Sequence, residues 1–206
     1  MSTAFAAVPA NTGKTPVAMG SSVPPWPSLR VPKMPRSFAT VRDLIYWEYA
    51  KLISERAVGD RLSYRFVNFT YRRLLEGEVS PSSILTENKR LFTLGEVCAY
   101  CGATGPLQWE HIIPLALGGP DSIDNMVRAC APCNQTKGAR DPYQWFLGGG
   151  RGDSIPRIVL GKFLKVVFEE YSARELLDST EYMRRHTVER MSLSSIFLDR
   201  SAPANA

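Results

Sequence analysis

The chain has 206 residues, of which 44% are hydrophobic and 22% charged, a composition typical of a globular protein with one main core. No stretch approaches the roughly 20 consecutive apolar residues that a membrane helix needs, so the sequence predicts no membrane span. The formal net charge of +5 arises in residues 1–42, which contain no acid and hold Lys14, Arg30, Lys33, Arg36 and Arg42. Net charge therefore gives no evidence that the folded part binds nucleic acid.

Residues 1–37 form the first predicted segment, a basic arm rich in proline, serine and alanine, as in "SSVPPWPSLRVPKMPRS". Such a segment cannot bury enough apolar surface to offset its ordering entropy, so we expect it to be disordered. Its composition is also compatible with an organelle transit peptide, but an ordinary disordered arm is the favoured interpretation. It lacks the apolar run of a secretory signal, so we expect the cytoplasm or another reducing compartment.

Residues 38–90 form a predicted helical flank. Apolar residues recur every three or four positions in "TVRDLIYWEYAKLISERAVG", which predicts a helix with a capped start at Thr40 and Asp43 and an end at Gly59. A second helix is predicted over residues 62–75, before Gly77. The following "SPSS" is typical of a turn.

Residues 91–146 form a predicted small module of short strands and tight turns, and this module holds all four cysteines of the chain. They form two CxxC pairs, Cys98 with Cys101 and Cys130 with Cys133. Two such pairs can complete a tetrahedral Zn²⁺ site. The alternatives are two disulfides or a redox-active pair, but an even set of paired cysteines without a secretion signal favours a structural zinc.

Residues 147–206 form a predicted C-terminal helical extension. After the "GGGRGD" loop, "IPRIVLGKFLKVVFEEYSARELL" and "STEYMRRHTVERMSLSSIFL" return to helical spacing. His186, among arginines on the second of these helices, has no neighbours of metal-ligand type and is interpreted as structural or superficial. We expect the flanking helices to position nucleic acid, to form a homodimer or to hold a partner protein.

The segment between the cysteine pairs is longer than in a simple zinc ribbon. Most of it, together with the second pair, lies in the stretch "WEHIIPLALGGPDSIDNMVRACAPCNQTKG". With its bracketing cysteines, over about residues 95–142, this segment resembles the HNH endonuclease family in its zinc-stapled form. The resemblance implies an α+β fold: a small ββα-metal module with a structural zinc, flanked by N- and C-terminal helices. It also implies a nuclease that cleaves nucleic acid, with DNA favoured over RNA.

The resemblance implies a role for each motif residue. His111 would be the general base, because an imidazole is largely neutral at physiological pH and can accept a proton. Glu110 and Asn134 would supply oxygen ligands to a catalytic Mg²⁺ or Mn²⁺. Neighbours on a strand point to opposite faces, so Glu110 and His111 can share one phosphate only if the strand bends or ends there.

Three further residues complete the predicted site. Asn125 matches the middle Asn of the family motif and would brace the loop that holds His111. Lys137 follows Asn134 by one helical turn, and we expect Lys137 and Arg140 to contact nucleic acid. The chain departs from the commonest family pattern in having Glu before the histidine, where Asp is usual, and Asn134 where many members have a final histidine.

Other interpretations of the same residues remain open. A lone histidine beside two isoleucines is often a core residue, with Glu110 as its hydrogen-bond partner. The module could also be a catalytically silent zinc module that binds nucleic acid, or part of an assembly subunit. Trp109 and Trp145 are predicted to lie in the core of the module, with stacking on a base as the alternative.

Overall fold

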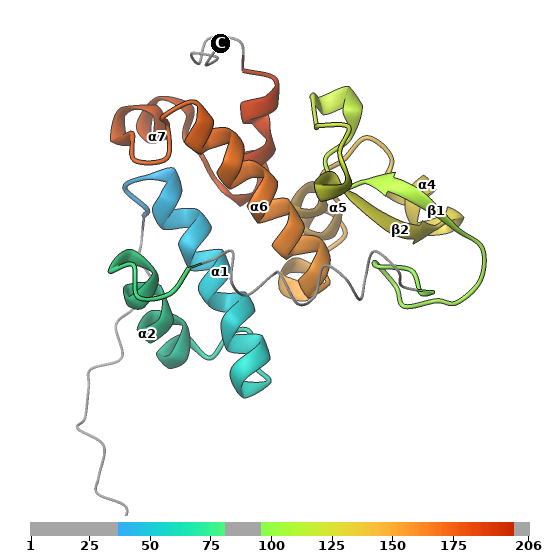
Figure 1. Ribbon diagram of the computed structural model, residues 1–206, viewed down its shortest axis with the longest axis horizontal. Coiled ribbons are helices and arrows are strands. Elements are labelled where there is room, and N and C mark those ends of the chain that lie inside the picture. The colour runs from blue at the N-terminus through green and yellow to red at the C-terminus, as the bar shows by residue number, and fades with distance from the viewer. Residues whose placement is uncertain (1–36, 81–95, 200–206) are drawn as a thin grey trace, which may run out of the picture. The chain divides into compact units, whose positions relative to one another are not determined.

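The computed structural model describes residues 37–80 and 96–199, which all lie in the unit Val31–Ala206 (Figure 1). The predictions for the arm, for residues 81–83 of the "SPSS" turn and for the start of the module fall outside the described residues. None of the described helices is long and apolar enough to cross a membrane.

Helix α1 (Val41–Val58) lies at the centre of the helical part (Figure 1). Its start is a capping box in which Thr40 and Asp43 bind each other's backbone N–H groups, and its end is Gly59 in the left-handed conformation at φ 74°. Both predicted ends of this helix are confirmed. Side chains are buried around most of α1, because α2 (Tyr64–Leu75) and α6 (Arg157–Ala173) both pack against it.

The small module contains an antiparallel hairpin followed by a short helix. Strand β1 (Leu107–His111) pairs with β2 (Met126–Cys130) in a register that places Glu110 opposite Val127 and His111 opposite Met126. Helix α4 (Ala131–Lys137) follows β2 directly and packs on both strands. This ββα unit, flanked by helices, confirms the α+β fold class.

The first cysteine pair is fixed to the hairpin by backbone hydrogen bonds. The N–H of Gly102 donates to the carbonyl of Cys98, which closes the turn, and the N–H of Ala99 donates to the carbonyl of Arg128 on β2. Gly102 adopts φ 74°, a conformation that side chains disfavour. The turn therefore presents its cysteines at the end of the hairpin where the second pair begins.

The remaining elements are short and lie in the loop between the strands, between α4 and α6, or after α6. They are the 3-10 helices η1 (Leu115–Leu117), η2 (Ile123–Asn125), η3 (Gly152–Ser154) and η4 (Arg190–Phe197) and the α-helices α5 (Pro142–Gly148) and α7 (Thr180–His186). The predicted last helix is thus divided, because the chain leaves α7 at Thr187 with a positive φ of 46° and continues as η4.

Helix α6 also holds the loop of the module. Lys162 Nζ donates to the carbonyls of Ile123 at 2.9 Å and Met126 at 2.5 Å, and Lys165 pairs with Asp124. These contacts fix the segment on both sides of Asn125. The helical flank therefore takes part in shaping the candidate site.

Candidate active site

His111 is the last residue of β1, so the strand ends at the position where the sequence required it to bend or end. Its side chain is 25% exposed, and its Nε2 lies 3.0 Å from Oδ1 of the exposed Asp121 in the loop between the strands. Because a carboxylate only accepts hydrogen bonds, Nε2 is the donor in this contact, and in a neutral imidazole with that tautomer Nδ1 keeps a lone pair.

Glu110 lies on the opposite face of β1 and is only 5% exposed. Its Oε2 accepts a hydrogen bond from the Tyr100 hydroxyl and its Oε1 one from Lys137, both at 2.5 Å. Burial and the nearby Glu110 carboxylate raise the pKa of Tyr100 well above its usual value, which keeps the phenol a donor. Both carboxylate oxygens are therefore held in place.

Lys137 lies beneath the hairpin with no exposed surface. Its ammonium donates to Glu110 Oε1 and, at 2.9 Å, to the carbonyl of His111, so one cation joins the two residues of the "EH" pair. Burial lowers the pKa of Lys137, and the Glu110 carboxylate opposes that shift. The phosphate contact expected for Lys137 stays a prediction, and it would require this pair to open.

Asn125, the residue directly before β2, is fully buried and holds the chain that follows His111. Its Oδ1 accepts from the N–H of Ile113, and its Nδ2 donates to the carbonyls of Ile113 and Pro120 at 2.8 and 2.9 Å. Its own carbonyl accepts from the N–H of Ile112 at 2.7 Å. This arrangement fixes the backbone on the C-terminal side of the histidine.

Helix α4 carries the other two predicted site residues. Asn134 is half-buried on its second turn, whereas Arg140 is exposed beyond its end. The Arg140 guanidinium binds the carbonyls of Thr136 and Lys137. It thereby caps the helix and keeps its charge at the surface of the module.

The four cysteines come together in one cluster. Their Sγ atoms all lie within 4.8 Å of one another, and the Sγ atoms of Cys101 and Cys130 are 3.8 Å apart. Four sulfurs bound at about 2.3 Å to one tetrahedral ion would be about 3.8 Å apart. All four thiols are free, so the donor set and its spacing fit a zinc ion rather than disulfides.

The thiols of this cluster differ in acidity. Burial raises the pKa of Cys98, but backbone N–H donors from Cys130, Cys101 and Tyr100 outweigh it and lower the pKa to about 7. Burial and the neighbouring thiols raise the pKa of Cys133. A cation among these sulfurs would favour their thiolate forms, because it would offset the repulsion between neighbouring negative charges.

Comparisons with known proteins agree with this geometry. The family model described as HNH endonuclease matches residues 98–140. The chain contains an HNH endonuclease domain. The chain is also similar to a CRISPR-associated endonuclease, Cas9 1 of Streptococcus thermophilus (strain ATCC BAA-491 / LMD-9), with 35% identity over 81 residues. That alignment covers 31% of this chain but only 7% of the relative. No solved structure gives a match.

The structure adds residues to the HNH domain that sequence reasoning missed. Tyr100 lies inside the first CxxC pair, whose spacing points to the cysteines alone, and Asp121 lies in a loop whose sequence predicts no contact with His111. Trp109 was predicted to be in the core, and this is wrong: it is 45% exposed, whereas Trp145 is buried as predicted. His186 stacks on Tyr182 with ring centroids 4.2 Å apart, as a structural residue would.

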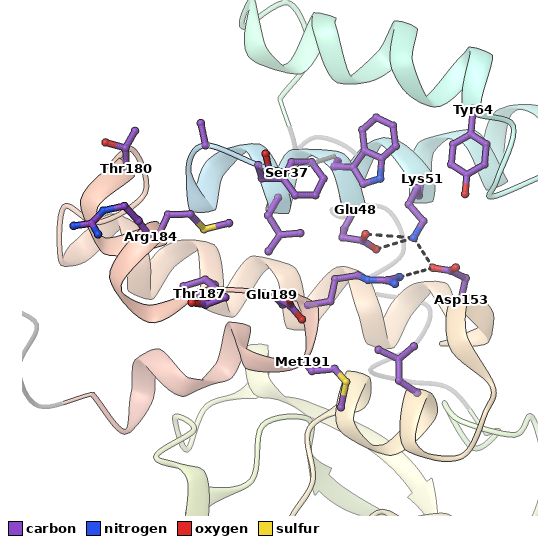
Figure 2. Close-up of a pocket in the computed structure, with 18 residues that line it drawn as sticks. Ser37, Glu48, Lys51, Tyr64, Asp153, Thr180, Arg184, Thr187, Glu189 and Met191 are labelled. Carbon is purple, nitrogen blue, oxygen red and sulfur yellow. Dashed lines mark hydrogen bonds and ion pairs between the residues drawn. The ribbon is translucent and has the colours of Figure 1, made fainter. Parts of the chain in front are cut away.

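A cavity of about 840 Å³ lies among the flanking helices, outside the HNH domain. Figure 2 shows that Glu48, Lys51 and Asp153 meet at one side of it. Lys51 Nζ lies 3.1 Å from Glu48 Oε2 and also binds Asp153, so these charges satisfy one another. Because no residue of 98–140 lines this cavity, it forms no part of the candidate active site.

Proposed function

We propose that the chain is a metal-dependent endonuclease that hydrolyses phosphodiester bonds in nucleic acid, with DNA favoured over RNA. The observation that carries this proposal is the position of His111 in an HNH domain. It lies at the end of β1 that leads into the loop connecting the two strands, with its ring bound to Asp121 and its carbonyl to Lys137.

His111 would act as the general base. The hydrogen bond from Nε2 to Asp121 leaves the Nδ1 lone pair to accept a proton from the attacking water, and the Asp121 carboxylate stabilises the imidazolium that forms. Asn125 fixes the backbone after His111, so it acts as a positioning residue. Products with 5′-phosphate and 3′-hydroxyl ends are expected, as in most of the family.

Glu110 and Asn134 would hold the catalytic Mg²⁺ or Mn²⁺ through a carboxylate and an amide oxygen, the hard donors that these ions prefer. Each Glu110 oxygen accepts a single hydrogen bond from Lys137 or Tyr100 and so keeps a further lone pair. When bound, the ion would neutralise charge on the phosphate in the transition state. Lys137 holds the Glu110 carboxylate in one orientation.

Cys98, Cys101, Cys130 and Cys133 would hold a separate, structural zinc. The fit of their sulfur spacing to a tetrahedral site supports this assignment. In the proposal the zinc joins the turn at Cys98 to the start of α4, so it fixes α4 and Asn134 against the hairpin. It takes no part in bond cleavage.

One observation favours a second candidate, an HNH module that binds nucleic acid without cutting it. Glu110 is almost completely buried and is already neutralised by Lys137, so a catalytic ion would have to share its carboxylate with a lysine. An assembly subunit that uses the flanking helices is a third candidate. Size-exclusion chromatography with and without DNA identifies it, because the elution volume of a pure assembly protein would not change when DNA is added.

Cleavage assays test the proposal directly. Wild type, His111→Ala and the surface variant Arg185→Ala are incubated with supercoiled DNA, single-stranded DNA and RNA, each with Mg²⁺ or Mn²⁺. We expect wild type and Arg185→Ala to cut DNA and His111→Ala to be inactive. A wild-type protein no more active than His111→Ala, with both folded and both binding DNA, would favour the silent module instead.

A further inference from the structure

An exposed aromatic side chain stands beside the candidate active site without a role in it. Trp109 lies on β1 two residues before His111, and 45% of its surface is exposed. Arg128 lies directly across from it on β2, with its guanidinium carbon 5.2 Å from the centre of the indole ring. Arg128 is itself fixed, because its Nη2 donates to the carbonyl of Leu107 at 2.9 Å.

Trp109 and His111 share one face of the hairpin. Side chains alternate along a strand, and the residue between them, Glu110, points into the interior. Two residues along a strand span about 6.8 Å. This is about two base steps at 3.4 Å per step, so a strand of nucleic acid cut at His111 would place a nearby nucleotide against Trp109.

We propose that Trp109 and Arg128 form a stacking platform for an unpaired nucleotide next to the phosphate that is cut. Arg128 covers one side of the indole, and the exposed remainder of the ring receives the base, while the cation attracts the phosphate backbone. Bases inside a duplex are stacked on one another and expose only their edges in the grooves. The platform therefore selects single-stranded or branched substrates over a fully paired duplex.

This inference rests on the proposed function for its position at the cut site, but the platform binds nucleic acid whether or not the chain cuts it. A purely structural role is the competing explanation, because a cross-strand pair of Trp and Arg also stabilises a hairpin. The two explanations differ in what substitution does. Loss of a structural pair lowers the melting temperature, whereas loss of a platform weakens binding of unpaired nucleotides in a protein that stays folded.

Binding is measured with the full chain carrying His111→Ala, without divalent ions, on a single-stranded oligonucleotide and on a fully paired duplex of the same sequence. We expect Trp109→Ala to weaken single-strand binding about tenfold and duplex binding far less. Trp109→Phe, which keeps a ring, should restore most of the affinity. In a chain that also carries Trp26→Phe, quenching of tryptophan fluorescence by the oligonucleotide should be largely lost in Trp109→Phe, since the two remaining tryptophans, Trp47 and Trp145, are buried.

Phe69→Ala is the matched control. Phe69 is also an exposed aromatic residue, with the Arg73 guanidinium carbon 5.7 Å from its ring centre, but it lies on α2 outside the HNH domain. Its loss should not weaken single-strand binding selectively over duplex binding. Cleavage by the same Trp109 variants, made without the His111 substitution, should show a raised KM on single-stranded substrates with a smaller change in kcat.

The outcomes separate this inference from the proposed function. Equal single-strand affinity of Trp109→Ala and its parent overturns the platform, even if the wild-type protein cuts DNA. An equal loss of affinity on single strand and duplex, with a lowered melting temperature, also overturns it in favour of the structural role. A selective loss of single-strand affinity in a chain that cuts nothing supports the platform and rejects the nuclease.

Discussion

Lys137 Nζ lies 2.5 Å from Glu110 Oε1, and this buried ion pair lies on the opposite side of the hairpin from the candidate base His111. The same ammonium binds the carbonyl of His111. The lysine therefore joins the candidate base, the candidate metal ligand and helix α4. Because both charges have left water, the pair depends on each partner being present.

Replacement of the lysine should therefore be costly for stability. Lys137→Met leaves the Glu110 carboxylate buried without its cation, and we expect it to lower the free energy of unfolding by about 3–5 kcal/mol. Urea denaturation followed by circular dichroism measures the change. The double variant Glu110→Gln with Lys137→Met should recover part of the loss, because no buried charge remains.

The exposed pair Arg185 and Glu181 provides the control for this experiment. Arg185→Met removes one partner of an ion pair in which each side chain is about two-thirds exposed, so we expect a cost below about 1 kcal/mol. Equal losses of unfolding free energy in Lys137→Met and Arg185→Met would show that the buried pair contributes no more to stability than an exposed pair.

The buried amide of Asn125 makes a second prediction. Asn125→Ala removes the side-chain hydrogen bonds to Ile113 and Pro120, and we expect a loss of about 2–4 kcal/mol of stability. The backbone N–H of Ile113 should exchange with solvent faster, since it loses its acceptor. Hydrogen exchange measured by NMR reports this amide directly. His111→Ala should leave the Ile113 exchange rate unchanged, and a matching increase in both variants would argue against the brace.

Much of the fold could be predicted because short-range interactions determine it. Thr40 and Asp43 are three residues apart and cap α1, and Gly59 ends it through its own conformational freedom. The CxxC pairs carry their chemistry within four residues each, and the structure brings them together as one cluster. These local sequence patterns depend little on how the rest of the chain packs.

Other features depend on long-range pairing that spacing does not encode. Glu110 and Lys137 are 27 residues apart, and only the folded helix α4 brings them together. That pair also explains why the prediction for Trp109 was wrong. Neighbours on a strand face opposite ways, so once Lys137 draws Glu110 inward, Trp109 must face outward. Hydrophobicity alone predicts a buried Trp109 and an exposed Glu110.

The cysteine cluster predicts a metal-dependent fold. We expect elemental analysis of the purified chain to find one zinc ion per molecule. Cys130→Ser should lose this ion and unfold the module, because structural zinc contributes on the order of 10 kcal/mol to the folding free energy of small domains. Acid should release the zinc, because metal binding needs deprotonated thiols and protons compete as the pH falls. Zinc retained by Cys130→Ser, or a melting temperature equal to that of wild type, would reject the site.

The loop between the strands gives the last prediction. A Cβ added at Gly119 would lie 2.1 Å from the carbonyl oxygen of Ile113, which is the oxygen that accepts the hydrogen bond from Asn125 Nδ2. Gly119→Ala must therefore push this carbonyl away from its partner. We expect the free energy of unfolding to fall by about 1–3 kcal/mol and cleavage to be reduced. Gly148→Ala is the matched control, because a Cβ there meets nothing within 4 Å and alanine favours the helix α5 in which it lies. Thermal melting of both variants measures the difference. If Gly119→Ala melts at the temperature of Gly148→Ala, the close approach of this loop to Ile113 does not hold the histidine's backbone in place.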